Sequence, residues 1–105
     1  MTYLDKSQIT RNNVFELVAQ CYFLRKHGYR LIVELNKKNA EKYYMVDFAY
    51  DNGKVFEDGT VARVTMAGDE NLDIDWDFRK DFTDMSALLD WMYDVECHEM
   101  YIDSF

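Results

Sequence analysis

Proline is absent from this chain of 105 residues, and glycine occurs only four times. The sequence also has no glycine-rich or serine-rich linker and no internal repeat that would separate it into parts. A length of about 100 residues is typical of one domain built around a single hydrophobic core. We therefore predict a single domain over residues 1–105.

Long hydrophobic runs are missing as well. No apolar stretch approaches the roughly 20 residues that a membrane-spanning helix needs. The N-terminal segment "MTYLDKSQIT" lacks the basic region followed by an apolar region that marks a signal peptide. We therefore expect a cytoplasmic protein that does not act at a membrane.

Cysteine is scarce, and the two cysteines are far apart. Neither Cys21 nor Cys97 has a second cysteine nearby that would complete a zinc-type pair. Both fall within helical patterns, and a free cysteine in a reducing compartment behaves as a small apolar residue. We predict two buried, reduced thiols, and we expect neither a metal nor another cofactor.

Positive charge is nearly absent from the last third of the chain. Residues 1–66 carry eight acidic and ten basic side chains, whereas residues 67–105 carry twelve acidic and two basic ones. The net charge of −8 therefore arises in the last third. Such a field disfavours direct binding to nucleic acid or anionic membranes and favours basic partners.

Apolar residues are plentiful, at 49% of the chain with 16% aromatic, which is ample for a folded core. A first helix is predicted to begin near Ser7, Thr10 or Asn13 and to end at Gly28. Phe15, Tyr22 and Phe23 are expected to widen its buried stripe. That stripe consists of residues at helical spacing: Val14, Leu17, Val18, Cys21 and Leu24.

Four strands are predicted after this helix, at residues 29–36, 42–50, 60–68 and about 72–78. Their short connections require antiparallel neighbours, because a parallel pair needs a crossover of about a dozen residues or more. Thr83 or Asp84 is expected to cap a second helix, after which "YIDSF" docks on the core. The predicted fold class is α+β with the order α-β-β-β-β-α, a four-stranded antiparallel sheet packed by an N-terminal and a C-terminal helix.

The segment "GDENLDIDWDF", residues 68–78, concentrates the negative charge. Large apolar residues occupy every second position from Leu72 to Phe78, which predicts a half-buried strand with Asp73, Asp75 and Asp77 on its outer face. Neighbouring carboxylates on that face stand about 7 Å apart and repel by roughly 0.6 kcal/mol in water. We expect Arg63 on a neighbouring strand to offset part of this repulsion.

Catalytic and metal-binding chemistry finds little support. The Asp73, Asp75 and Asp77 spacing resembles the start of a calcium loop, but Phe78 stands where that loop requires glycine. An open strand face also lacks the cleft in which paired carboxylates serve as general acid and base. No recognised nucleophile or nucleotide motif is present. We therefore predict a protein that is not an enzyme and has no catalytic residues.

Carboxylates of the second helix extend the acidic surface. Solubility alone is an alternative explanation for such a surface. The segregation of charge into the last third favours partner binding equally. The predicted contact residues are Asp69, Glu70, Asp73, Asp75, Asp77, Asp84, Asp90 and Asp94.

In size, charge and α/β layout, the chain resembles the small phage-encoded inhibitors of bacterial defence, such as anti-CRISPR proteins and other DNA mimics. The resemblance rests on "DENLDIDWDF" and "DWMYDVECHE" and not on a family motif. It implies a non-enzymatic protein in the host cytoplasm that binds a CRISPR effector or a similar nuclease. The contact would block the basic surface that otherwise meets nucleic acid.

Two alternatives stay open. One is an immunity protein that neutralises a toxic nuclease through a charge-complementary interface with aromatic anchors. The other is an acidic adaptor that does not mimic nucleic acid. The candidate anchors are Tyr43, Trp76, Trp91 and Tyr93.

Overall fold

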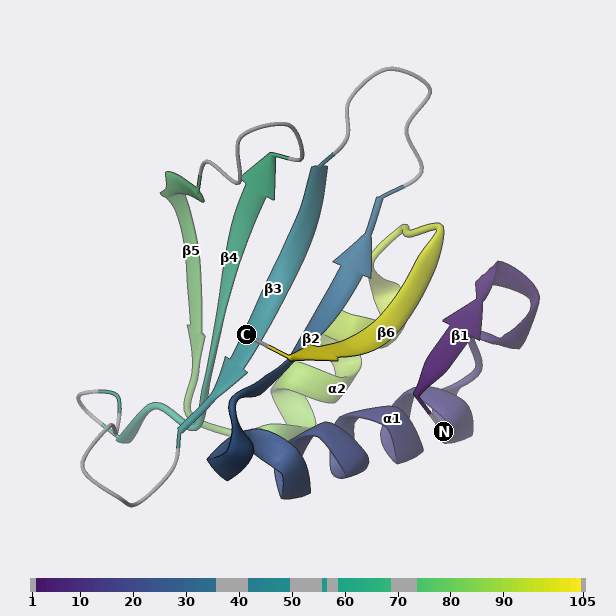
Figure 1. The fold of residues 1–105 in the computed structure, drawn as a ribbon, viewed down its shortest axis with the longest axis horizontal. Helices are drawn as coiled ribbons and strands as arrows, with labels where there is room; N and C mark the ends of the chain where they lie inside the picture. The colour runs from purple at the N-terminus through teal and green to yellow at the C-terminus, as the bar shows by residue number, and fades with distance from the viewer. Residues whose placement is uncertain (1, 36–41, 50–55, 57–58, 69–73, 105) are drawn as a thin grey trace.

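The computed structural model describes residues 2–35, 42–49, 56, 59–68 and 74–104, with the backbone alone for residues 74–77. In these residues the chain forms a six-stranded antiparallel sheet with two α-helices on one face (Figure 1). Short 3-10 turns η1 and η2 precede and follow the first helix. The elements in chain order are β1 (Tyr3–Asp5), η1 (Lys6–Gln8), α1 (Arg11–Leu24), η2 (Arg25–His27), β2 (Tyr29–Glu34), β3 (Lys42–Phe48), β4 (Ala62–Gly68), β5 (Ile74–Phe82), α2 (Met85–Asp94) and β6 (Glu99–Ser104).

The strand order is β1-β6-β2-β3-β4-β5, so the prediction of a four-stranded sheet is wrong. The α+β composition and the antiparallel pairing agree with the prediction. The two missed strands are β1 and β6. β6 pairs with β2 on one side, where Leu31 lies opposite Ile102, and with β1 on the other, where Leu4 lies opposite Met100. Strand pairing between segments so distant in sequence is not marked by a local sequence pattern. The residues of β6 are extended because they pair with β1 and β2.

Helix α1 begins at one of the predicted positions. The hydroxyl oxygen of Thr10 accepts a hydrogen bond from the backbone N–H of Asn13 at 3.2 Å, which satisfies a donor of the first turn. Beyond η2, Gly28 adopts the left-handed conformation, with φ at 82°, and ends the helical segment as predicted. The buried residues of α1 are Val14, Leu17, Val18 and Cys21.

Helix α2 is capped by Asp84, whose carboxylate accepts a hydrogen bond from the backbone N–H of Ser86 at 3.0 Å. The helix ends at Asp94, because Val95 is already extended. Cys97 therefore lies outside the helix, contrary to the prediction, although its burial is confirmed.

The main core lies between the helices and one face of the sheet. Burial of each large aliphatic side chain contributes roughly 1.5 to 3 kcal/mol. Leu4 and Met100, from the two strands that the sequence did not reveal, are fully buried there. The other face, here called the open face, has a smaller buried cluster of Ile32, Met45 and Ala67. The fully buried residues of the main core include Leu17, Leu31, Val33, Val46, Val64, Leu88 and Met92.

Strand β5 is irregular. It pairs with β4 from Phe82 to Arg79, and the pairing then shifts so that Met66 lies opposite Asp75 and Ala67 opposite Ile74. Residues 76–78 are skipped at this shift, which has the character of a β-bulge. A single alternation of inward and outward residues, as predicted over Leu72 to Phe78, does not continue unbroken through β5, because a bulge resets which residues share a face.

Candidate functional site

The fold divides the acidic last third of the chain among three places. Strand β5 forms one edge of the sheet, β6 lies between β1 and β2 toward the other edge, and α2 covers the helix-bearing face (Figure 1). Strands β2, β3 and β4 separate β5 from β6. The charge that is contiguous in sequence is therefore distributed around the molecule.

Five of the eight predicted contact residues precede β5 in the sequence or belong to it. Asp69, Glu70 and Asp73 lie outside the described residues. The backbone of Asp75 and Asp77 belongs to β5. Asp75 lies opposite Met66, and Asp77 is among the residues skipped at the register shift. The row of aspartates on the outer face of this strand stays a prediction.

The other three predicted residues are exposed carboxylates on α2. Asp84 is its N-cap, and Asp94 is its last residue. Asp90 accepts a hydrogen bond from Nη1 of Arg11 at 3.2 Å, but the two side chains are 62% and 65% exposed. A pair so exposed contributes little to stability. Because the chain has neither lysine nor arginine from residue 81 to its end, α2 presents a single sign of charge.

The open face has charges of both signs in one row across the sheet. Asp103, Arg30, Asp47, Arg63 and Asp81 follow one another from β6 to β5. Nε of Arg30 lies 3.1 Å from the carboxylate of Asp47, and Nε of Arg63 lies 2.9 Å from that of Asp81. Within the described residues, Arg63 forms an ion pair with Asp81; the expectation that it also offsets the predicted aspartate row stays a prediction.

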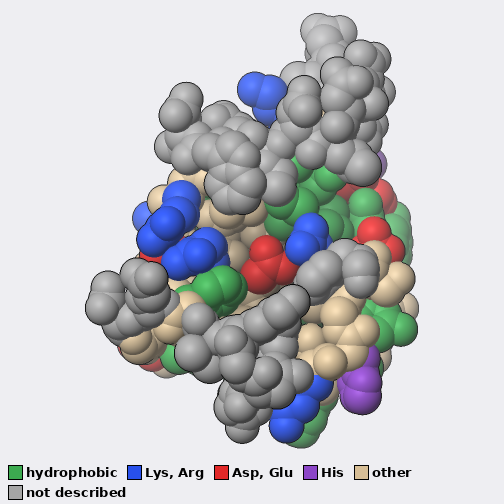
Figure 2. All heavy atoms as spheres, turned by 60° about the vertical axis from the view of Figure 1, so that its left-hand side comes forward, with side chains coloured by type: hydrophobic (Ala, Val, Ile, Leu, Met, Phe, Trp, Pro, Cys, Tyr) green, Lys and Arg blue, Asp and Glu red, His purple; other side chains and the backbone are tan. Residues whose placement is uncertain are grey.

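The described part of β5 carries basic side chains after the predicted acidic segment. Nη2 of Arg79 also binds the carboxylate of Asp81, at 2.9 Å. Lys80 follows in the same strand, with its ammonium group 5.8 Å from the centre of the Phe82 ring. Figure 2 shows several lysine and arginine side chains near acidic ones on the side where β4 and β5 lie. The described part of this edge is therefore mixed in charge.

Two carboxylates of the open-face row have pKa values shifted in opposite directions. Burial raises the pKa of Asp47, although Arg30 and Arg63 oppose this shift. The hydrogen bond from Arg63 lowers the pKa of Asp81, and Arg79 lowers it further. Both shifts follow from packing and pairing within the sheet.

Aromatic side chains on α1 form a feature that the sequence reasoning missed. Phe15, Tyr22 and Phe23 were predicted to be buried, but they are 58%, 37% and 79% exposed. The signal was present, because Phe15, Ala19 and Phe23 recur at every fourth residue as a second apolar stripe. The helix thus has one apolar stripe in the core and another at the surface.

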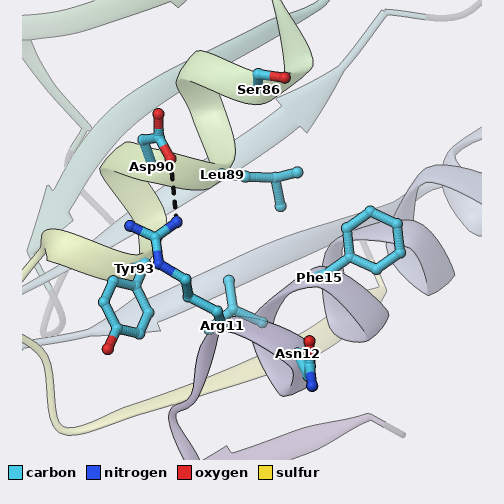
Figure 3. A pocket seen from close by; sticks show the side chains of 8 residues that line it. Arg11, Asn12, Phe15, Ser86, Leu89, Asp90 and Tyr93 are labelled. Atoms are coloured by element: carbon cyan, nitrogen blue, oxygen red, sulfur yellow. Dashed lines mark hydrogen bonds and ion pairs between the residues drawn. The ribbon is translucent and has the colours of Figure 1, made fainter.

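Two adjoining hollows lie at the surface between α1 and α2, and together they form what we call the interhelix groove. One hollow, of about 260 Å³, includes Arg11, Asp90 and Tyr93 (Figure 3). The other, of about 200 Å³, is apolar. Phe15 and Leu89 line both hollows and project into the space between the helices. The apolar hollow is lined by Phe15, Val18, Ala19, Tyr22, Phe23, Met85 and Leu89.

The predicted aromatic anchors differ in accessibility. Trp91 is only partly exposed, and its ring packs against Tyr44 and Phe82 at centroid distances of 5.2 and 6.0 Å. It packs against the main core, and its role as an anchor stays a prediction. Tyr93 is 40% exposed, and the guanidinium of Arg11 lies 4.5 Å from its ring centre. Tyr43 is partly buried on the open face, and the side chain of Trp76 lies outside the described part.

The described residues offer little for catalysis. They contain no group of three or more histidine, cysteine, aspartate or glutamate side chains that could hold a metal ion. Burial raises the pKa of Cys21 to about 12 and that of Cys97 to about 11, so both thiols are protonated at neutral pH.

Within the described part of the chain, neither helix has the length and apolar character needed to cross a membrane. Comparison with known proteins finds no family model, no curated protein and no solved structure that matches this chain.

Proposed function

We propose that this protein is a non-enzymatic inhibitor that binds the basic nucleic-acid-binding surface of a bacterial defence nuclease, such as a CRISPR effector. The observation that supports the proposal is the set of exposed carboxylates on α2: Asp84, Asp90 and Asp94. Proteins that bind DNA neutralise its phosphates with lysine and arginine side chains. Exposed carboxylates compete for the same side chains.

The helix-bearing side suits this role better than the described open face. Asp47 and Asp81 on the open face already bind Arg30 and Arg63. An incoming cation would have to displace these arginines. Among the described residues, neither Asp84 nor Asp94 forms an ion pair, and the pair of Asp90 with Arg11 is largely exposed to solvent, so its replacement costs little.

Magnitudes show that α2 covers only part of a nucleic-acid site. Ten helical residues span about 15 Å, and a DNA duplex of that length carries about nine phosphate charges. Three carboxylates therefore match roughly a third of that charge. We expect the remaining affinity to come from other contacts, including the predicted residues in and before β5.

Competition with DNA tests the proposal. Purified CRISPR effectors loaded with guide RNA, together with restriction nucleases, would be mixed with fluorescent duplex DNA and increasing amounts of the protein. We expect the protein to displace DNA from at least one nuclease, and the displacement to weaken between about 50 and 200 mM salt. Absence of displacement from every nuclease, or displacement that salt leaves unchanged, would contradict the proposal.

Two variants with equal charge locate the contact. In the first, Asp84, Asp90 and Asp94 are each replaced by asparagine, which retains the ability to cap α2. In the second, the control, Asp5→Asn, Glu99→Gln and Asp103→Asn remove three charges from β1 and β6. We expect the α2 variant to need at least tenfold more protein for half-displacement, and the control to change less than threefold. Equal losses in both variants would show that net charge alone matters.

A further inference from the structure

The interhelix groove joins an apolar hollow to one that contains the ion pair of Arg11 and Asp90. Among the described residues, no charged side chain lines the apolar hollow. Phe15 and Phe23 leave most of their area in solvent, at 58% and 79% exposure. Exposed apolar surface gathered in one concave place is characteristic of a protein-binding site.

Helix α2 forms one wall of the groove and has exposed carboxylates at Asp84, Asp90 and Asp94; of these, Asp90 lines the groove, and the other two lie beyond its lining. The middle of α1 adds Glu16, which is also exposed. The arginines at the two ends of α1 have internal contacts. Arg11 binds Asp90, and Nε of Arg25 donates to the backbone oxygen of Ala49 at 2.7 Å.

This charge distribution distinguishes among possible occupants. A second copy of the chain would bring its own acidic α2 and its net charge of −8 against the same wall. An anionic membrane carries the same sign of charge. A basic amphipathic helix matches both features, since its apolar face fits the hollow and its cationic flank faces α2.

We propose that the interhelix groove binds an amphipathic helix of a partner protein. A leucine or phenylalanine of that helix occupies the apolar hollow between Phe15, Phe23 and Leu89. Lysine or arginine residues beside it face Asp84 and Asp90, and the nearest one replaces Arg11 as the partner of Asp90. The positive charge of the partner rests on the proposed function, whereas the apolar contact does not, because mimicry of DNA requires no apolar hollow.

A synthetic peptide probes the groove directly. The probe is an 18-residue helix of leucine and lysine with leucines at positions i, i+3, i+4 and i+7, labelled with fluorescein. A peptide with the same composition in scrambled order retains the charge but has no apolar face. We expect the amphipathic peptide to bind the full chain at least tenfold more tightly than the scrambled one. We also expect it to shift the amide NMR signals of Ala19 and Leu89.

The double variant Phe15→Ala and Phe23→Ala removes the exposed aromatic rings without changing charge. Alanine is the better helix former, so α1 is preserved. Tyr3→Ala is the control, because Tyr3 is 48% exposed on β1, outside the groove. We expect the double variant to weaken binding of the amphipathic peptide at least tenfold and the control to change it less than twofold.

Four outcomes would overturn the groove proposal. These are equal binding of the scrambled peptide, unchanged affinity in the double variant, a wild-type dimer that the double variant dissociates, and binding to lipid vesicles that depends on Phe15 and Phe23. The DNA competition assay separates the two proposals. If the peptide binds in the groove but the protein displaces no DNA, the proposed function fails and the apolar contact stands. If the protein displaces DNA but the peptide does not bind in the groove, the proposed function stands and the groove proposal fails.

Discussion

The carboxylates of the open face and those of α2 differ in their surroundings. The side chains of Arg30 and Asp47 are 24% and 27% exposed, and they lie in a row where each charge faces an opposite one. The side chains of Arg11 on α1 and Asp90 on α2 are 62% and 65% exposed, and the other charged residues of α2 and its cap, Asp94 and Asp84, are negative. The open face uses its charges to hold strands together, whereas α2 leaves its charges available to a partner.

This difference shows that acidic composition does not by itself define a binding surface. Within the last third, Asp81 is used by the sheet, because Arg63 and Arg79 both bind it. Asp94, in the same acidic third, is exposed at the end of α2. The neighbours of a carboxylate decide its role, and the following measurements challenge that distinction.

The largest effect on stability is expected from Arg30→Ala. It would leave the partly buried Asp47 without the Arg30 guanidinium, and removal of one member of such a pair costs about 2 to 4 kcal/mol. Urea denaturation would measure the loss. The double variant Arg30→Met and Asp47→Leu removes both charges and should recover more than half of it. A loss below about 0.5 kcal/mol in the single variant would place this pair in the same class as the exposed pair on α2.

The capping residue of α2 gives the next largest effect. Asp84→Ala removes the oxygen that accepts from the backbone of Ser86, and we expect a loss of about 1 kcal/mol in thermal or urea denaturation. Asp84→Asn retains an acceptor and should stay within a few tenths of the wild type. If the two variants are equally destabilised, the negative charge of Asp84 stabilises the helix more than its capping hydrogen bond does.

The exposed pair of Arg11 and Asp90 should contribute much less. A double-mutant cycle of Arg11→Ala and Asp90→Ala is expected to give a coupling energy of about 0.2 to 1 kcal/mol, lower at high salt. The same cycle on Arg30 and Asp47 serves as the comparison and should give a larger value. Equal coupling in both cycles would remove the distinction drawn between the two regions.

The pH dependence of stability should differ in sign between Asp47 and Asp81. The raised pKa of Asp47 means that the folded state gains stability as pH falls from neutral toward about 4. The lowered pKa of Asp81 means that its contribution is present above about pH 4 and is lost at lower pH. These are the smallest effects expected.

The measurement is the unfolding free energy of the wild type minus that of each variant across this pH range. For Asp47→Asn the difference should rise as pH falls toward 4. For Asp81→Asn it should fall as pH drops below 4. Two curves of the same sign would show that burial and pairing do not distinguish these carboxylates.

Much of the fold was predictable where the determinants are local. The hydroxyl of Thr10, the left-handed Gly28 and the carboxylate of Asp84 fix helix boundaries through neighbouring backbone groups. Strands β2, β3 and β4 follow the alternation of their own side chains. Strands β1 and β6 depend on pairing partners elsewhere in the chain, which no pattern within "YLD" or "EMYIDS" reveals.

The candidate sites divide in the same way. That Asp84, Asp90 and Asp94 avoid the buried stripe of α2 was visible from helical spacing. Helical spacing places Phe15 and Phe23 on a second apolar stripe of α1, but it does not show which of the two stripes faces solvent. Their exposure depends on where α2 crosses α1. The register shift in β5 likewise depends on its contact with β4.

The position of β6 between β1 and β2 has a consequence for synthesis on the ribosome. β2 emerges about 65 residues before the strand that covers its outer edge, as the pairing of Glu34 with Glu99 shows. At about 5 to 20 residues per second, that edge waits roughly 3 to 13 s for its partner. During this interval β1 also has no strand to join. A nascent chain with an open interior edge exposes unpaired backbone N–H and C=O groups, and the sheet is completed only when β6 inserts between β1 and β2.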